Sequence, residues 1–111
     1  MLVHNSTPTS CWTSTNTKTA SQNEFDHWDK HKSEFPHINS QQGYVDAAQR
    51  FMRSQDPWIQ TKTRSNGDMV RFNRVTDEFG IMTNAGEMRT YYKPDPSKHG
   101  YASNQDYFDA Q

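Results

Sequence analysis

The sequence has little cysteine, little net charge and no long apolar run, and each shortage excludes a class of protein. Cys11 is the single cysteine among 111 residues, so no internal disulfide can form and the fold does not depend on an oxidising compartment. The formal net charge of -1 argues against a domain that coats nucleic acid by charge alone. No apolar run approaches the roughly 18 residues of a transmembrane helix, and the first residues lack the features of a secretory signal. We expect a protein with no membrane span that works in a cytoplasm.

Apolar residues are also scarce, which limits the size of the core. Hydrophobic residues make up 31% of the chain and the mean hydropathy is -1.16, so a single domain of marginal stability is expected. Residues 1–22 are dominated by Ser, Thr and Asn, and Lys18 is the one Lys, Arg, Asp or Glu among them. This composition predicts a flexible polar leader or linker over 1–22 and a folded domain over 23–111.

Two stretches have the apolar spacing of amphipathic helices. Residues 23–35 fit a helix with Asn23 as N-cap, because Asn favours that position and acidic residues follow it in the first turn. Residues 41–54 fit a second helix, capped by Asn39 or Ser40, with apolar residues three and four apart.

After the second predicted helix the apolar spacing changes to two residues, which is typical of strands. The four strand-like runs are 58–64, 69–73, 79–83 and 88–93. Their connections are too short for parallel crossovers, so neighbouring strands must be antiparallel. The predicted fold class is α+β, with two N-terminal helices packed on one face of a four-stranded antiparallel sheet. Residues 94–111 have no predicted regular structure, but their aromatic residues are expected to fasten them to the domain.

His27 and His31 are four residues apart in the first predicted helix, so their side chains are neighbours on its surface. Three interpretations are open. A zinc helix is one, but a metalloprotease helix needs Glu after the first His, where this chain has Trp28, and no third ligand is evident. A plain structural role at the edge of the apolar stripe is another. The third is acid–base catalysis of RNA cleavage, which moves two protons and needs no metal or other cofactor.

Alternation along the predicted strands separates a core face from an exposed face. The residues predicted to line the core are Val70, Phe72, Met88 and Tyr92. The residues predicted to share the exposed face are Arg71, Arg89, Tyr91 and Lys93. Such a face would suit a phosphate backbone, with Tyr91 stacking on a base, although Arg and Lys on a solvated strand are also ordinary. Thr90 is predicted to face inward, so a catalytic role there requires the histidine helix to lie against that face at the sheet's edge.

Several segments of the chain form a spaced set of motifs. They are His27–Phe35, Asn66–Phe72, Glu78–Ile81, Arg89–Pro96, His99–Tyr101 and Asp106–Phe108. In this order they resemble the C-terminal toxin modules of bacterial polymorphic toxins, which include contact-dependent growth inhibition effectors and related repeat-containing effectors. Agreement of several spaced motifs is more specific than any single one. Residues 1–22 have no counterpart in the resemblance.

The resemblance implies a ribonuclease fold of the barnase, EndoU, colicin and RelE type, metal-independent cleavage of RNA with transfer RNA as the usual target, and a cognate immunity protein. The helix motif implies His27 and His31 as site residues with Lys30 beside them, and the strand motif implies Arg89, Thr90 and Tyr91. Two positions depart from the expected pattern, Lys32 where glycine and Asp109 where a polar residue such as asparagine is expected. Neither departure changes a proposed catalytic group.

The leading hypothesis is an endoribonuclease toxin that cleaves transfer RNA to a 2′,3′-cyclic phosphate. Its proposed catalytic residues are His27, His31, Arg89, Thr90 and Tyr91, and its proposed substrate-binding residues are Lys30, Arg71 and Lys93. The expected setting is the C-terminal module of a secreted or cell-surface effector that acts in the cytoplasm of a target bacterium. Residues 58–93 carry a small positive excess, so an acidic immunity protein is expected, and an elongation factor is a further candidate partner. The alternative is a non-catalytic module that inhibits by binding RNA or a translation factor.

Overall fold

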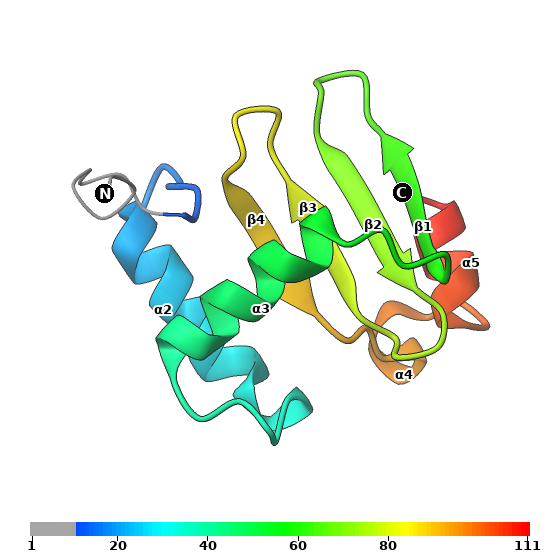
Figure 1. Ribbon diagram of the computed structural model, residues 1–111, viewed down its shortest axis with the longest axis horizontal. Helices are drawn as coiled ribbons and strands as arrows, with labels where there is room; N and C mark the ends of the chain where they lie inside the picture. The colour runs from blue at the N-terminus through cyan, green and yellow to red at the C-terminus, as the bar shows by residue number, and fades with distance from the viewer. Residues whose placement is uncertain (1–10) are drawn as a thin grey trace.

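The structure is a computed structural model that describes residues 11–111, and its elements follow the predicted order of helices and then strands (Figure 1). The helical elements are α2 (Ala20–His31), the 3-10 turn η1 (Lys32–Glu34), α3 (Gln41–Arg53), α4 (Pro96–His99) and α5 (Asn104–Asp109). The strands are β1 (Ile59–Thr63), β2 (Met69–Asn73), β3 (Phe79–Met82) and β4 (Met88–Tyr92). In this part of the chain no helix is long and apolar enough to cross a membrane.

The four strands form one antiparallel sheet in the order β1-β2-β3-β4, which confirms the predicted α+β fold class and the meander. Each tight connection uses the expected turn chemistry. Gly67 and Gly86 have φ values of 93° and 91°, a left-handed conformation that a residue without a Cβ adopts at little cost.

Helix α3 packs across one face of the sheet, and its start matches the predicted capping residue. Ser40 Oγ accepts a hydrogen bond from Gly43 N–H at 3.0 Å, which satisfies one of the free amides of the first turn. Its apolar stripe, which includes Tyr44 and Phe51, is buried against the sheet. Gly80 of β3 permits this approach, because a Cβ there would lie 2.8 Å from Met52 Sδ.

Helix α2 begins earlier than predicted and ends earlier. Thr19, not Asn23, is the N-cap, and its Oγ1 accepts from Gln22 N–H at 3.1 Å. Asn23 is instead buried, and its side chain donates to Thr13 O at 2.9 Å. The α-helix stops at His31, and η1 carries the chain on to Glu34.

The segment before α2 belongs to the folded body, so the predicted leader boundary at residue 22 is wrong for residues 11–22. Trp12 is fully buried in the core, in contact with the Tyr44 ring. Thr13 N–H donates to Met88 O at 2.9 Å, and a parallel bridge joins Trp12 to Met88 at the free edge of β4. The rest of the predicted leader, residues 1–10, lies outside the described residues.

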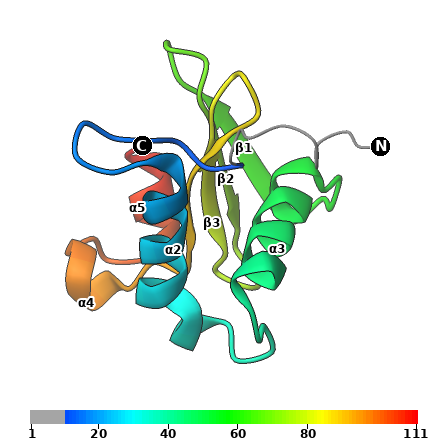
Figure 2. The same ribbon diagram turned by 90° about the vertical axis from the view of Figure 1, so that its left-hand side faces the viewer.

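The C-terminal segment forms two short helices, where no regular structure was predicted. Helix α5 covers the face of the sheet opposite α3, so helices lie on both faces and not on one (Figure 2). Phe108 is buried against Val70 and Phe72, with its ring stacked 5.8 Å from that of Phe72. The expectation that the aromatic residues of this segment fasten it to the domain is confirmed.

A bulge in β4 places Met88 on the face opposite the one predicted, whereas Tyr92 keeps its predicted face with Val70 and Phe72. Ile81 pairs with Thr90, but Met82 pairs with Met88, so Arg89 is the extra residue. Alternation restarts after the bulge, and Met88 and Tyr91 therefore share the α3 face. Thr90 and Tyr92 point to the opposite face.

Candidate active site

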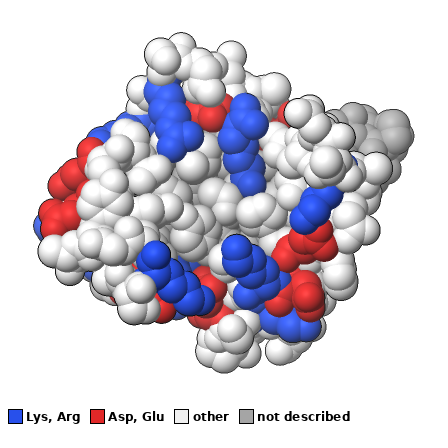
Figure 3. Space-filling model, turned by 180° about the vertical axis from the view of Figure 1, so that it is seen from behind, with Lys and Arg blue, Asp and Glu red and all other residues white. Residues whose placement is uncertain are grey.

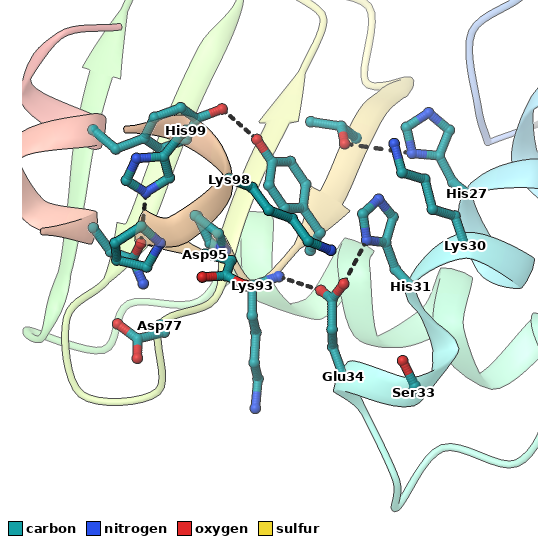
Figure 4. A pocket seen from close by; sticks show the side chains of 16 residues that line it. His27, Lys30, His31, Ser33, Glu34, Asp77, Lys93, Asp95, Lys98 and His99 are labelled. Atoms are coloured by element: carbon teal, nitrogen blue, oxygen red, sulfur yellow. Dashed lines mark hydrogen bonds and ion pairs between the residues drawn. The ribbon is translucent and has the colours of Figure 1, made fainter. Parts of the chain in front are cut away.

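A pocket of about 750 Å³ lies over β4, between α2 and the two C-terminal helices (Figure 4). Three histidines line it, namely His27, His31 and His99. Three lysines also line it, namely Lys30, Lys93 and Lys98. On this side of the molecule Figure 3 shows a hollow with blue cationic side chains and some red acidic ones around it. The pocket thus combines imidazoles with cations, which are the groups that phosphate chemistry needs.

His31 is held on two sides within the pocket. Its Nδ1 lies 2.7 Å from Glu34 Oε2, and its ring stacks on Tyr92 with centroids 5.0 Å apart and planes at 20°. A carboxylate accepts hydrogen bonds, so Nδ1 is the donor and carries a proton. The nitrogen left for a substrate is Nε2.

Glu34 also ties the end of α2 to the end of the sheet. Its second oxygen, Oε1, accepts a hydrogen bond from the Lys93 backbone N–H at 2.7 Å. Both carboxylate oxygens are therefore engaged, one by the ring of His31 and one by the chain just after β4. This arrangement restricts the movement of the carboxylate and, through it, of the imidazole.

His27 lies beside His31, with ring centroids 5.9 Å apart, and its Nδ1 is 3.4 Å from Thr90 Oγ1. Burial, followed by the nearby positive charges of His31 and Lys30, lowers the pKa of His27 from 6.5 to about 4. At neutral pH its ring is uncharged and able to accept a proton. The contact with Thr90 also shows that α2 lies against the inward face of β4, as a role for Thr90 requires.

Lys30 and Lys93, which the sequence analysis proposes as substrate-binding residues, both line the pocket. The Lys93 ammonium lies 5.3 Å from the centroid of the Phe35 ring, which positions this cation near the end of η1. Lys98, from α4, adds a cation on the opposite wall.

Tyr91 is not on an exposed face, so that prediction is wrong. Its side chain is 1% exposed and packs beneath α3, and its hydroxyl donates to Glu78. Burial raises the pKa of Tyr91 well above its ordinary value, and the bond to Glu78 adds to this effect. Tyr91 shares a face of the sheet with Arg71, as alternation predicted, but α3 covers that face.

The structure does not bring Arg71 and Arg89 to the histidines. Arg71 lies on the α3 face, where its guanidinium donates to Thr61 Oγ1 and to Phe51 O at 3.0 Å each. Arg89 occupies the bulge, and its Nε donates to Asp68 Oδ2 at 2.8 Å. Neither arginine lines the pocket, so the predicted exposed face shared by Arg71, Arg89, Tyr91 and Lys93 is wrong.

Sequence reasoning did not select Glu34, Tyr92 or His99 as site residues. Glu34 had a usable signal, because a carboxylate three residues after His31 faces it across one helical turn. Tyr92 was assigned to the core by alternation, and it does pack against the cluster of Val70 and Phe72, but it also lines the pocket. His99 lies far along the chain, and only the docking of α4 and α5 brings it to the pocket.

No group of three His, Cys, Asp or Glu side chains within residues 11–111 is arranged to hold a metal ion.

The fold resembles that of a known ribonuclease. No protein-family model matches the sequence, and no curated protein matches it. Among solved structures, the chain is similar to one described as a ribonuclease from Escherichia coli complexed with its inhibitor protein. The two share 20% sequence identity with a TM-score of 0.54, and the match covers 78% of this chain and 95% of that chain. At this level of identity the similarity is one of fold. It agrees with the ribonuclease-type fold that the sequence motifs imply.

Proposed function

We propose that the protein is an endoribonuclease that cleaves RNA without a metal, with His27 and His31 as its acid–base pair. The observation that carries this proposal is the pocket itself. It places an uncharged imidazole beside a second imidazole backed by a carboxylate, on a floor formed by Thr90 and Tyr92 and under a rim of lysines. A module that inhibits by binding alone has no need of such a pair.

The proposed reaction transfers two protons within one pocket. His27 takes the proton of the ribose 2′-hydroxyl, and the 2′-oxygen then attacks the adjacent phosphorus. The bond from phosphorus to the 5′-oxygen breaks, and that oxygen takes a proton from His31 Nε2. The products are a 2′,3′-cyclic phosphate and a 5′-hydroxyl, so atoms and charge balance without a co-reactant.

Other groups in the pocket are proposed to stabilise the charge that develops on the phosphate. Lys30 faces the phosphate oxygens, whose negative charge increases during attack, and Lys93 would add a second cation once its ammonium moves from the Phe35 ring into the pocket. Thr90 Oγ1, next to His27, is placed to orient the 2′-hydroxyl or a phosphate oxygen. Glu34 compensates the positive charge on His31 while that ring holds both of its protons.

The biological setting is part of the proposal. The resemblance of the sequence motifs to polymorphic toxin modules supports transfer RNA as the target, delivery as the C-terminal module of a secreted or cell-surface effector, and action in the cytoplasm of a competing bacterium. The structural neighbour is described in complex with an inhibitor protein, which supports a cognate immunity protein for this chain. An acidic immunity protein would complement the lysine rim.

Incubation of the purified protein with total RNA in EDTA, followed by mapping of the RNA ends, tests the proposal. The expected products carry 2′,3′-cyclic phosphate and 5′-hydroxyl ends, and His31→Ala abolishes them while keeping the far-UV circular dichroism of the wild type. Intact RNA would support the binding module instead, and cleavage that needs added metal would contradict the mechanism. A parallel reaction with a purified elongation factor tests whether that partner presents the RNA.

A further inference from the structure

His99 is the third histidine of the pocket, and hydrogen bonds engage both of its ring nitrogens. The Tyr101 backbone N–H donates to Nδ1 at 3.1 Å, and Nε2 lies 2.9 Å from Asn104 Oδ1. A ring nitrogen that accepts a hydrogen bond carries no proton, so Nε2 bears the proton of the neutral ring and donates it to Asn104. His99 therefore has no nitrogen free for proton transfer to a substrate.

What His99 offers the pocket is a flat ring. This ring stacks on Tyr107, with centroids 4.4 Å apart and planes at 14°. The Tyr107 hydroxyl is hydrogen-bonded to that of Tyr92, whose ring stacks on His31. A row of aromatic rings thus runs across the floor of the pocket from His31 to His99 (Figure 4). Rows of this kind are what single-stranded nucleic acids stack their bases on.

A hydrogen-bond donor stands beside this ring. Because His99 Nε2 donates to Asn104 Oδ1, the amide nitrogen Nδ2 of Asn104 points away from His99. Within residues 11–111 that nitrogen has no acceptor, although Asn104 lines the pocket. An amide donor can hydrogen-bond the edge of a splayed nucleobase, and a neighbouring aromatic ring can stack on the face of that base.

We infer that the His99 end of the pocket binds a nucleobase of the RNA substrate, adjacent to the phosphate at His27 and His31. The base stacks at the aromatic end of the floor, Asn104 Nδ2 donates to a carbonyl oxygen or ring nitrogen of the base, and Lys98 faces the adjoining phosphate. The volume of about 750 Å³ exceeds what a phosphate group alone requires. This inference rests on the proposed ribonuclease function and adds a site that selects or holds one base.

A binding experiment tests the subsite without any need for cleavage. The histidine Cε1–H signals of the full chain are followed by NMR during titration with each of the four 5′-nucleoside monophosphates and with ribose 5-phosphate, which lacks a base. Nucleoside monophosphates are expected to shift the His99 signal, assigned with His99→Leu, and ribose 5-phosphate is expected to leave it in place. Equal shifts of the His99 signal with both kinds of ligand, or no shift with any ligand, would overturn the inference.

A kinetic experiment tests the same subsite during cleavage. Asn104→Asp keeps the oxygen that accepts from His99 but removes the Nδ2 donor, and Asn84→Asp adds the same charge on an exposed turn outside the pocket. We expect Asn104→Asp and His99→Leu to raise KM about tenfold, the size of one lost base contact, with kcat within about twofold of wild type. Asn84→Asp should change neither constant. Loss of kcat at unchanged KM would contradict the subsite, whereas a wild-type protein that leaves all RNA intact would contradict the proposed function.

Discussion

At the residue scale, the two neighbouring histidines of α2 differ because their surroundings differ. His27 contacts the buried Trp12 ring at 5.3 Å and has no carboxylate hydrogen bond among the described residues, whereas His31 is paired with Glu34. The same residue type, one helical turn apart, thus meets a different environment at each position, which is the basis for proposing that His27 takes a proton and His31 gives one.

The lowered pKa of His27 makes stability depend on pH. Its ordinary value of 6.5 applies to the unfolded chain and about 4 to the folded one, so the unfolded chain binds this proton more readily between these values. We expect the free energy of unfolding to decrease as pH falls from 6.5 towards 4. Urea unfolding at several pH values measures the slope, which His27→Gln should reduce and His37→Gln, at an exposed histidine, should leave unchanged. An identical slope in His27→Gln would contradict the assignment.

Glu34 is expected to act on the reaction through His31 and not through the substrate. Glu34→Gln keeps an oxygen for the Lys93 N–H but loses the negative charge beside the imidazole. We expect kcat to fall about 10- to 100-fold, within the range of acid–base contributions, with KM nearly unchanged. Steady-state cleavage of a short RNA measures both constants, and Glu87→Gln, outside the pocket, is the control. A change confined to KM would assign Glu34 to substrate binding instead.

At the scale of elements, the segment Cys11–Thr19 acts as a strap that closes the edge of β4. Its anchor is Trp12, fully buried between α2 and α3, in contact with the rings of His27 and Tyr44. The strap thus supports the helix that carries the histidines. The polar composition of this segment does not indicate such a role, because most of its buried surface comes from one large side chain, that of Trp12.

Removal of the strap's anchor should cost much of the stability of this small domain. Trp12→Ala is expected to lower the free energy of unfolding by about 3–5 kcal/mol, as for other buried aromatic residues truncated to alanine. Trp58→Ala is the matched control, because that ring is 49% exposed, and its effect should stay below about 1 kcal/mol. Urea unfolding followed by circular dichroism measures both. Similar losses in the two variants would show that Trp12 is not an anchor.

The elements that the sequence predicts well are those with strong periodicity and local end signals. Helix α3 and strands β2, β3 and β4 fall within one residue of their predicted ends, because apolar spacing and turn residues are local properties. The start of α2 was misplaced since both Thr19 and Asn23 are good capping residues, and tertiary contacts decide between them. Helices α4 and α5 are too short to leave a periodic pattern.

The candidate site was predicted only in part, because local sequence patterns again decide which of its residues can be found. His27, His31 and Thr90 come together because helix spacing and strand alternation are regular near them. The predicted exposed basic face was wrong because α3 covers Arg71 and Tyr91 and because the bulge takes Arg89 out of the alternation. His99 reaches the pocket through the path of the chain after Tyr92, which local spacing does not encode.

At the scale of the whole molecule, a formal net charge of -1 coexists with a pocket lined by three lysines. The lysines near the histidines are expected to replace counterions on the RNA backbone, so cleavage should weaken as salt increases. Three carboxylates also line the pocket, namely Asp77, Asp95 and Glu34, which pairs with His31, so we expect the salt dependence to come from individual contacts of lysines with phosphates.

Salt dependence provides a test at this scale. Replacement of Lys30 and Lys98 together by Gln should reduce the slope of log kcat/KM against log salt concentration by about 1.4, at roughly 0.7 for each lost phosphate contact. The control replaces Lys18 and Lys32, which pair with Asp26 and Asp29 and do not line the pocket, and removes the same charge. Equal slopes in the two double variants would show that the rim does not meet the substrate.

The pocket is assembled from both ends of the described chain, and this affects when activity can arise during synthesis. One wall comes from α2 and the other from α4 and α5, which leave the ribosome after α2. A nascent polypeptide whose α4 and α5 have not yet emerged can hold the imidazoles of α2, but it lacks the opposite wall. We expect chains stalled at that stage to be inert towards RNA, so that a producing cell has the interval before final docking in which an antidote can bind.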